Sequence, residues 1–329
     1  MTFDNLPDLP PQTDDMWKAI ERARGPEPFN QMLSLSACFL PNVAEEVWTL
    51  TSLRSLDLSL NKLEKLPESL GNLADLQFLD LCFNQLNCLP HSLAKLSKLH
   101  TLKLLGNRLD NLPEQVRPLT ALRCLRLQQN KFNKLPTWLG ELIELTELDV
   151  SGNTIRKLPG SLRKLKKLRY LLAINNQVNT MPDWLADLPE LLWLGLDGNK
   201  LKQIPSALLN HHGLKHLTLG RNQIGQLPAG INQMNQLEQL LLHHNTLHEL
   251  PESILDLKHL RRLDLRYNRF QKFPKILLNW PDLKIDFEYK GKAPRVKDKV
   301  VFLEGNPISD VPIEVMTQGI PRVRAFLGQ

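Results

Sequence analysis

LQFLDLCFNQLNCLPHSLAKL, residues 76–96, is one copy of a unit that recurs every 23 residues along this chain. Its first leucine recurs at Leu53, Leu76, Leu99, Leu122, Leu145, Leu168, Leu191, Leu214, Leu237 and Leu260. Its asparagine recurs at Asn61, Asn84, Asn107, Asn130, Asn153, Asn176, Asn199, Asn222, Asn245 and Asn268. Its proline recurs at Pro67, Pro90, Pro113, Pro136, Pro159, Pro182, Pro205, Pro228, Pro251 and Pro274. A fixed period in this range indicates a solenoid, in which each repeat buries its apolar side only against its neighbours.

The first half of the unit has the period-two pattern of a strand. Leu79 and Leu81 alternate with Phe78, Asp80 and Cys82, so one face of the strand is expected to point into the core. Stacked strands form a parallel sheet with neighbours about 4.8 Å apart, so equivalent positions line up in columns. The pattern therefore predicts a sheet whose exposed face presents columns of variable side chains.

The second half of the unit turns the chain away from the sheet. Asn84 lies where the strand ends, and its amide can satisfy backbone groups at a turn and, repeated in every rung, form a ladder. Pro90 fixes φ and blocks strand continuation, which favours extended or short helical segments on the outer side. Because these outer segments are wider than a strand, we expect the sheet to lie on the concave side.

The unit L-x-x-L-x-L-x-x-N-x-L-x-x-L-P-x-x-L-x-x-L resembles the leucine-rich repeat family over residues 30–284 and again over 301–312. Its 23-residue, Leu-Pro-containing form is similar to intracellular Ras-group and scribble-type repeats and to the repeats of bacterial Roco-type proteins. The resemblance implies an α/β repeat fold: a solenoid with a concave parallel sheet and short helical or extended convex segments. It also implies protein partners, such as small GTPases or their regulators.

The chain is expected to form one domain with capped ends. Residues 1–29 are predicted to be a helical cap (or a partner-binding helix), 30–312 a solenoid of about 12–13 repeats, and 313–329 a C-terminal cap. The repeat becomes irregular and basic over 286–299: Asp286 falls at a core position and Gly291 replaces the asparagine. A one-residue slip would allow Ile285 and Phe287 to take the core positions.

Composition and motifs argue against an enzyme and against a membrane span. We find no phosphate-binding loop, dinucleotide glycine motif or H-E-x-x-H sequence, so no catalytic site and no cofactor are predicted. No secretory leader or long apolar run is evident, and the four cysteines are scattered, which favours a cytoplasmic protein with reduced thiols. Seven of the nine histidines lie between 211 and 259, but their spacing favours solvated or partner-facing side chains over a zinc site.

Two groups of side chains are predicted on the concave face of the sheet. Tyr170, Trp193 and His216 are consecutive in one column, beside Leu172 and Ile174, and nothing in the repeat requires aromatic residues there. The second group is basic and aromatic, and acidic partners would be steered towards it. The full set of predicted partner-binding residues is Phe78, Phe83, Arg126, Tyr170, Leu172, Trp193, His216, Arg221, His243, His244, Arg262, Arg266 and Tyr267.

The sequence therefore predicts a monomeric, non-catalytic scaffold or adaptor that binds a protein on its concave sheet. One alternative is a secreted bacterial effector that engages host proteins with the same face. Another is a polyanion or membrane-surface binder, because the net charge is +6 and a convex basic patch is predicted, although such a charge run is more often a solvated face. The residues of that patch are Arg163, Lys164, Lys166 and Lys167. No specific nucleic-acid recognition is predicted.

Overall fold

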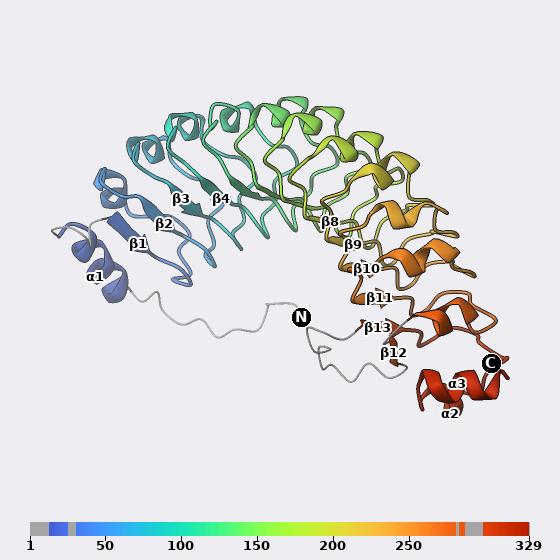
Figure 1. Cartoon of the computed structure of the whole chain (residues 1–329). Coiled ribbons are helices and arrows are strands. Elements are labelled where there is room, and N and C mark those ends of the chain that lie inside the picture. The colour runs from blue at the N-terminus through green and yellow to red at the C-terminus, as the bar shows by residue number, and fades with distance from the viewer. Residues whose placement is uncertain (1–12, 26–30, 281–282, 287–298, 329) are drawn as a thin grey trace. The chain divides into compact units, whose positions relative to one another are not determined.

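The structure is a computed structural model that describes residues 13–25, 31–280, 283–286 and 299–328. These residues group into two compact units that divide after Phe132. In each unit a three- or four-residue strand alternates with a short 3-10 helix, so that strands line one side and helices the other (Figure 1). The predicted solenoid of parallel strands and short outer helices is confirmed.

Unit 1 ends at Phe132 and contains five strands that pair in parallel. Its elements are α1 (Thr13–Ala23), β1 (Met32–Ser34), η2 (Glu45–Thr49), β2 (Ser55–Asp57), η3 (Glu68–Asn72), β3 (Phe78–Asp80), η4 (His91–Lys95), β4 (Thr101–Lys103), η5 (Glu114–Val116) and β5 (Cys124–Arg126). Its register places Phe78 beside Thr101 and Thr101 beside Cys124, as the 23-residue step predicts.

Unit 2 begins at Asn133 and contains the remaining strands. Its elements are η6 (Thr137–Glu141), β6 (Glu147–Asp149), η7 (Gly160–Lys164), β7 (Tyr170–Leu172), η8 (Asp183–Asp187), β8 (Trp193–Gly195), η9 (Ser206–Asn210), β9 (His216–Thr218), η10 (Ile231–Gln233), β10 (Gln239–Leu241), η11 (Glu252–Asp256), β11 (Arg262–Asp264), η12 (Lys275–Asn279), β12 (Leu283–Asp286), β13 (Lys299–Phe302), α2 (Ile313–Met316) and α3 (Ile320–Phe326). The 23-residue register continues from β6 through β11.

The sequence explains both halves of a rung. In β8 the central Leu194 is fully buried, while Trp193 on the other face remains exposed; we call this second face the open face of the sheet. Pro205 then precedes η9 with φ of −68°, close to the value that its ring imposes. Because the proline cannot donate a sheet hydrogen bond, the strand ends and a 3-10 turn begins on the outer side.

The predicted asparagine ladder is present in both units. In unit 2 the Asn222 amide donates to the Leu196 and Leu219 carbonyls over 2.9 and 3.0 Å, and its oxygen accepts from the Leu201 amide over 2.9 Å. In unit 1, Asn84 makes the equivalent bonds to neighbouring rungs. Each buried asparagine therefore satisfies backbone groups that would otherwise lack partners at the turn.

The last rungs do not follow chain order. β13 lies between β11 and β12, with Leu263 paired to Val301 and Val301 paired to Ile285. Asn306, which follows β13, continues the ladder by donating to the Leu265 carbonyl over 2.9 Å. β13 therefore continues the repeat after β11, as expected near residue 301, while β12 lies at the edge of the sheet.

The expected register slip is only partly realised. Ile285 is half-buried on the edge strand and does not occupy the rung next to β11, where Val301 is buried instead. Phe287 lies outside the described residues. The physical reason is the ladder: residue 291 is a glycine and cannot replace the asparagine amide, whereas Asn306 can.

Short helices lie at both ends of the repeat array. In unit 1, α1 lies against β1 and buries Ile20 and Ala23. In unit 2, α2 and α3 pack together, α3 contacts β12, and Met316 and Val323 are buried. The division into terminal caps and a single solenoid domain stays a prediction.

Candidate functional site

The predicted aromatic column is assembled on the open face of unit 2. Tyr170, Trp193 and His216 pair across β7, β8 and β9. The Tyr170 and Trp193 rings meet edge-on, with centroids 6.5 Å apart, and the Trp193 and His216 rings are tilted, with centroids 5.5 Å apart. Tyr170 is 40% exposed and Trp193 37% exposed, although the repeat gives neither ring a packing role.

A glycine allows an apolar floor to form beside this column. Gly195 occupies the strand position where neighbouring rungs carry Leu172 and Thr218. A Cβ at Gly195 would lie 2.8 Å from Leu172 Cδ2 and 3.4 Å from Ile174, so both apolar side chains lean over the glycine. We call Tyr170, Leu172, Ile174, Trp193 and His216 the aromatic patch. The sequence predicted its members, but not the way that Gly195 brings them together.

The second predicted group forms a cluster on β11 and on the turns that follow β9, β10 and β11. We call Arg221, His243, His244, Arg262, Arg266 and Tyr267 the arginine–histidine cluster. Three of them, Arg221, His244 and Tyr267, have φ of 53–54°, a left-handed backbone that disfavours large side chains. Other rungs have glycine at the same position, including Gly198 and Gly305.

The aromatic members of this cluster are stacked. The His244 and Tyr267 rings lie nearly parallel with centroids 4.3 Å apart, and Tyr267 covers Gly305 of the following rung. The Tyr267 hydroxyl donates to Glu304 over 3.1 Å, and this hydrogen bond raises the pKa of the tyrosine. The rings therefore form a defined surface at the edge of the open face.

Arg266 is held by an internal carboxylate. Asp264 is 1% exposed and accepts two hydrogen bonds from the Arg266 guanidinium, over 2.9 and 2.6 Å. Such a bidentate pair is strong, and it compensates the charge of both groups. Sequence reasoning counted Arg266 as a cation available to a partner; the signal for the pairing was Asp264, two residues earlier on the same strand face.

His243 and Arg262 each have a buried nitrogen without a hydrogen bond to the described residues. The His243 Nδ1 atom lies 3.9 Å from an Asp264 oxygen, too far for a hydrogen bond, and burial lowers the pKa of this histidine. The Arg262 Nε atom is also buried, and its guanidinium lies 5.2 Å from the centre of the Phe302 ring. Phe302 belongs to β13, which pairs with β11 out of chain order, so its place beside Arg262 was not foreseen.

Three of the predicted partner-binding residues, Phe78, Phe83 and Arg126, belong to unit 1. Phe78 on β3 lies beneath the Lys103 ammonium, 4.6 Å from its ring centre. Phe83 adopts φ of 54° and covers Gly106 of the next rung. Arg126 ends β5.

On the outer side of unit 2, part of the predicted basic patch is compensated. Lys167 forms an ion pair with Glu144 over 2.6 Å, and Lys166 donates to the Asp187 carbonyl over 2.8 Å. Arg163 and Lys164 lie in the last turn of η7. The Glu144 carboxylate offsets the charge of Lys167, whereas the backbone carbonyl holds Lys166 without neutralising it.

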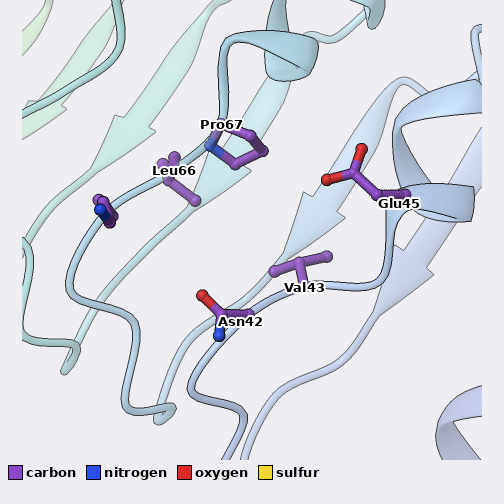
Figure 2. Close-up of a pocket in the computed structure, with 6 residues that line it drawn as sticks. Asn42, Val43, Glu45, Leu66 and Pro67 are labelled. Atoms are coloured by element: carbon purple, nitrogen blue, oxygen red, sulfur yellow. The ribbon is translucent and has the colours of Figure 1, made fainter.

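Two further polar features of the described residues are a buried histidine and a hollow in unit 1. Over the described ranges, no group of three histidine, cysteine or acidic side chains could hold a metal ion. His211 is buried, and its Nε2 atom forms a hydrogen bond of 2.8 Å with the Leu188 carbonyl. A hollow in unit 1 offers one carboxylate, Glu45, and one ammonium, Lys65. Figure 2 shows Glu45 and Val43 on its wall.

Within the described part of the chain, the search for membrane-spanning helices found none of sufficient length and apolar character.

Comparison with known proteins identifies the family. The model of the family described as leucine rich repeat matches residues 31–86, 143–201 and 212–270, which together make up more than half of the chain. The chain therefore belongs to the leucine-rich repeat proteins. Domains of this family bind protein partners and are generally non-enzymatic. No match was found among curated protein sequences.

Solved structures of this fold are numerous. A leucine-rich repeat protein of Leptospira interrogans is 27% identical, with a TM-score of 0.66 over 91% of this chain and 82% of that one. YopM from Yersinia enterocolitica is 27% identical, with a TM-score of 0.56 over 80% of this chain and 49% of that one. An internalin of Listeria monocytogenes is 20% identical, with a TM-score of 0.70 over 95% of this chain and 97% of that one, which shows the fold alone.

Proposed function

We propose that this protein is a non-catalytic recognition scaffold that binds a partner protein on the open face of unit 2. The observation that carries the proposal is the aromatic patch: Tyr170 and Trp193 are adjacent and exposed, and the apolar side chains of Leu172 and Ile174 lie against Gly195 on the same face. Contiguous exposed apolar surface marks interaction sites, and tyrosine and tryptophan are the residues that most often anchor interfaces.

The fold favours recognition because it presents these side chains on a rigid sheet. Each strand of the patch is hydrogen-bonded to its neighbours, and the leucines beneath it, such as Leu171 and Leu194, are fully buried. A preformed surface loses little conformational freedom on binding, so more of the interaction energy appears as affinity. The polar arginine–histidine cluster extends the same face and would contribute specificity more than affinity.

Several finer assignments belong to the proposal. The Leu-Pro-containing 23-residue unit supports the intracellular Ras-group or scribble-type subclass, with bacterial Roco-type relatives, and hence small-GTPase-type signalling. The four cysteines, Cys38, Cys82, Cys88 and Cys124, are not joined in disulfides, which fits reducing surroundings such as the cytoplasm. We propose a monomer without cofactor.

The proposal is tested by affinity capture from native cell extract with wild type and a Tyr170→Ala/Trp193→Ala variant. Loss of each anchor is expected to weaken a true interface by at least about 2 kcal/mol, so the bound partner should disappear. An Ile143→Ala variant is the matched control, since Ile143 is 54% exposed and lies outside the sheet. Circular dichroism and urea midpoints verify folding. Retention of every captured protein by the double variant contradicts the proposal.

The effector alternative uses the same surface and differs in location. Bacterial proteins are among the structures similar to this chain, and this similarity supports the effector alternative. Detection of the protein in the culture medium of intact source cells would favour it over a cytoplasmic scaffold.

A polyanion or membrane-surface role through Arg163, Lys164, Lys166 and Lys167 has less support, because two of the four are engaged internally. That role predicts binding to heparin or anionic vesicles that falls steeply with salt and is lost in an Arg163→Gln/Lys164→Gln variant.

A further inference from the structure

The arginine–histidine cluster contains donors that the protein itself does not satisfy. Arg266 is bound by Asp264, but no ion pair is formed by Arg221 or Arg262 with the residues that the structure describes. The Arg262 Nε and His243 Nδ1 atoms are buried and lack hydrogen-bond partners in the same part of the chain. A buried polar group without a partner is costly, so each one calls for a physical explanation.

The charge of the cluster selects the kind of ligand. Asp264 and Glu304 already accept hydrogen bonds from Arg266 and the Tyr267 hydroxyl. Arg221 and Arg262 are the two arginines of the cluster that form no ion pair with the described residues, and they leave the cluster positively charged. A guanidinium binds carboxylates with paired, charge-assisted hydrogen bonds. The aromatic face of Phe302 beneath Arg262 holds the guanidinium in place, so less freedom is lost when a carboxylate binds.

Register fixes the distance between this cluster and the aromatic patch. Trp193 on β8 and Arg262 on β11 occupy one column, because His216, Gln239 and Arg262 follow Trp193 in successive pairings. Three strand spacings of about 4.8 Å separate the two residues by roughly 14 Å. An extended segment rises about 3.3 Å per residue, so it covers that distance in about four residues.

Side-chain alternation sharpens this spacing. In an extended segment, residues i, i+2 and i+4 point to one side and residues i+1 and i+3 to the other. An apolar side chain at i on Trp193 and a carboxylate at i+4 on Arg262 can therefore face the sheet together. A carboxylate at i+3 or i+5 would point away from it.

From these observations we infer that the partner of this surface presents an extended segment with a bulky apolar side chain followed or preceded, four residues away, by an aspartate or glutamate. The apolar side chain lies on the aromatic patch, and the carboxylate is bound by Arg262 with Arg221 nearby. The inference rests on the proposed function and specifies the chemistry of the partner.

The test is selection of binders from a random peptide display library on folded wild type and on Arg262→Gln, with Lys202→Gln as a control, because Lys202 is exposed and lies outside the strands. Wild type and the Lys202 variant should enrich an apolar residue and an acidic residue four positions apart, in either direction. Arg262→Gln should lose the acidic preference and keep the apolar one. Failure to enrich any sequence, or the same acidic preference on Arg262→Gln, overturns the inference.

An enriched peptide then provides the quantitative test. Replacing its acidic residue by the neutral amide should weaken binding to wild type roughly tenfold, and leave binding to Arg262→Gln unchanged. Moving the acidic residue by one position should have the same effect as neutralising it. If the peptide binds more tightly with phosphoserine than with glutamate at that position, the group that Arg262 recognises is a phosphate, and the inference of a carboxylate is wrong.

The same measurements separate this inference from the proposed function. If Trp193→Ala abolishes capture of the native partner while the acidic preference does not depend on Arg262, the recognition surface stands and the partner chemistry is wrong. If Trp193→Ala changes neither partner capture nor peptide binding, both are wrong.

Discussion

At the scale of single residues, the most informative position is the one before each ladder asparagine. Among the described rungs it adopts a left-handed backbone whether it is glycine, as at Gly152 and Gly198, or a large side chain, as at Arg221 and Tyr267. For a residue other than glycine this backbone costs roughly 1–2 kcal/mol. Large side chains at this position therefore point to a role other than stability.

Arg221→Gly tests this trade of stability for binding. The substitution removes left-handed strain but adds chain entropy to the unfolded state, so the free energy of unfolding should stay constant or rise by up to about 1 kcal/mol. Gln223→Gly is the control, because Gln223 is also exposed but lacks the positive φ. The free energy of unfolding of this variant should fall by about 0.5–1 kcal/mol. Urea unfolding measures both. A clear loss of stability in Arg221→Gly would show that the arginine is structural.

His211 shows how one buried side chain makes stability depend on pH. It occupies the place of the leucine that ends the outer helix in rungs such as those of Leu165 and Leu188. Its Nε2 bonds the Leu188 carbonyl and its Nδ1 accepts from the Gly213 amide, an arrangement that requires the neutral ring. Burial accordingly lowers the pKa of His211.

The sign of the pH effect follows from this lowered pKa. In the unfolded chain His211 takes up a proton as the pH falls through its ordinary pKa of about 6.5, whereas in the folded chain the ring stays neutral to lower pH. The free energy of unfolding that His211 contributes is therefore fully present above about pH 6.5 and decreases below it. His211→Leu should reduce the slope of stability against pH between about 6.5 and 5 by up to about 1.4 kcal/mol per pH unit. His216 and His243 leave some slope, because burial also lowers their pKa.

Urea unfolding at several pH values measures that slope. The exposed His259 provides the comparison, and His259→Gln should keep the wild-type dependence. An unchanged slope in His211→Leu would mean that His211 is not neutral in the folded protein.

At the scale of elements, β13 matters most, because it enters the sheet out of chain order. The rung after β11 needs apolar residues for the core and an asparagine for the ladder. Residues 299–306 supply Val301, Leu303 and Asn306 in that pattern, and β12 remains at the edge. Side-chain chemistry at the turn, more than proximity in the chain, decides which segment completes the stack.

A substitution within β13 tests this assignment. Phe302 is 1% exposed and packs under Arg262, so Phe302→Ala should destabilise the protein by about 3–5 kcal/mol. Phe326→Ala is the control, because it removes the same side chain from a position that is 52% exposed. It should lower the free energy of unfolding by less than about 0.5 kcal/mol. Thermal or urea unfolding distinguishes them, and equal costs would place β13 outside the folded core.

At the scale of the whole molecule, the repeat made most of the fold predictable. Each leucine and asparagine has a neighbour 23 residues away in the same environment, so local sequence also defines the nonlocal contacts, such as Asn222 with Leu196. The exposed columns followed from the same register, which is why Tyr170, Trp193 and His216 were placed together.

The features that escaped prediction depend on departures from the repeat. The contact of Arg262 with Phe302 joins residues 40 positions apart, because β13 skips the intervening segment. The Arg266–Asp264 pair depends on burial of Asp264, which side-chain alternation alone would have placed on the exposed face. Periodicity thus defines the scaffold, while the chemistry of the surface depends on packing between rungs.

A repeat array also makes a prediction about how damage spreads. Each rung bonds only to adjacent rungs, so loss of one ladder asparagine should loosen its neighbours and leave distant rungs intact. Asn84→Ala removes bonds to the Leu58 and Leu81 carbonyls in unit 1, and Asn222→Ala removes bonds to the Leu196 and Leu219 carbonyls in unit 2. Buried groups left without partners cost about 1–3 kcal/mol each.

Hydrogen–deuterium exchange read by mass spectrometry measures this spread. In Asn84→Ala, exchange should rise in β2 to β4 and stay at the wild-type level in β8 to β11. In Asn222→Ala the pattern should reverse: exchange should rise in β8 to β11 and stay at the wild-type level in β2 to β4. An equal rise in all strands of either variant would mean that the whole chain opens as one cooperative unit, and the recognition surface would then be sensitive to changes anywhere in the array.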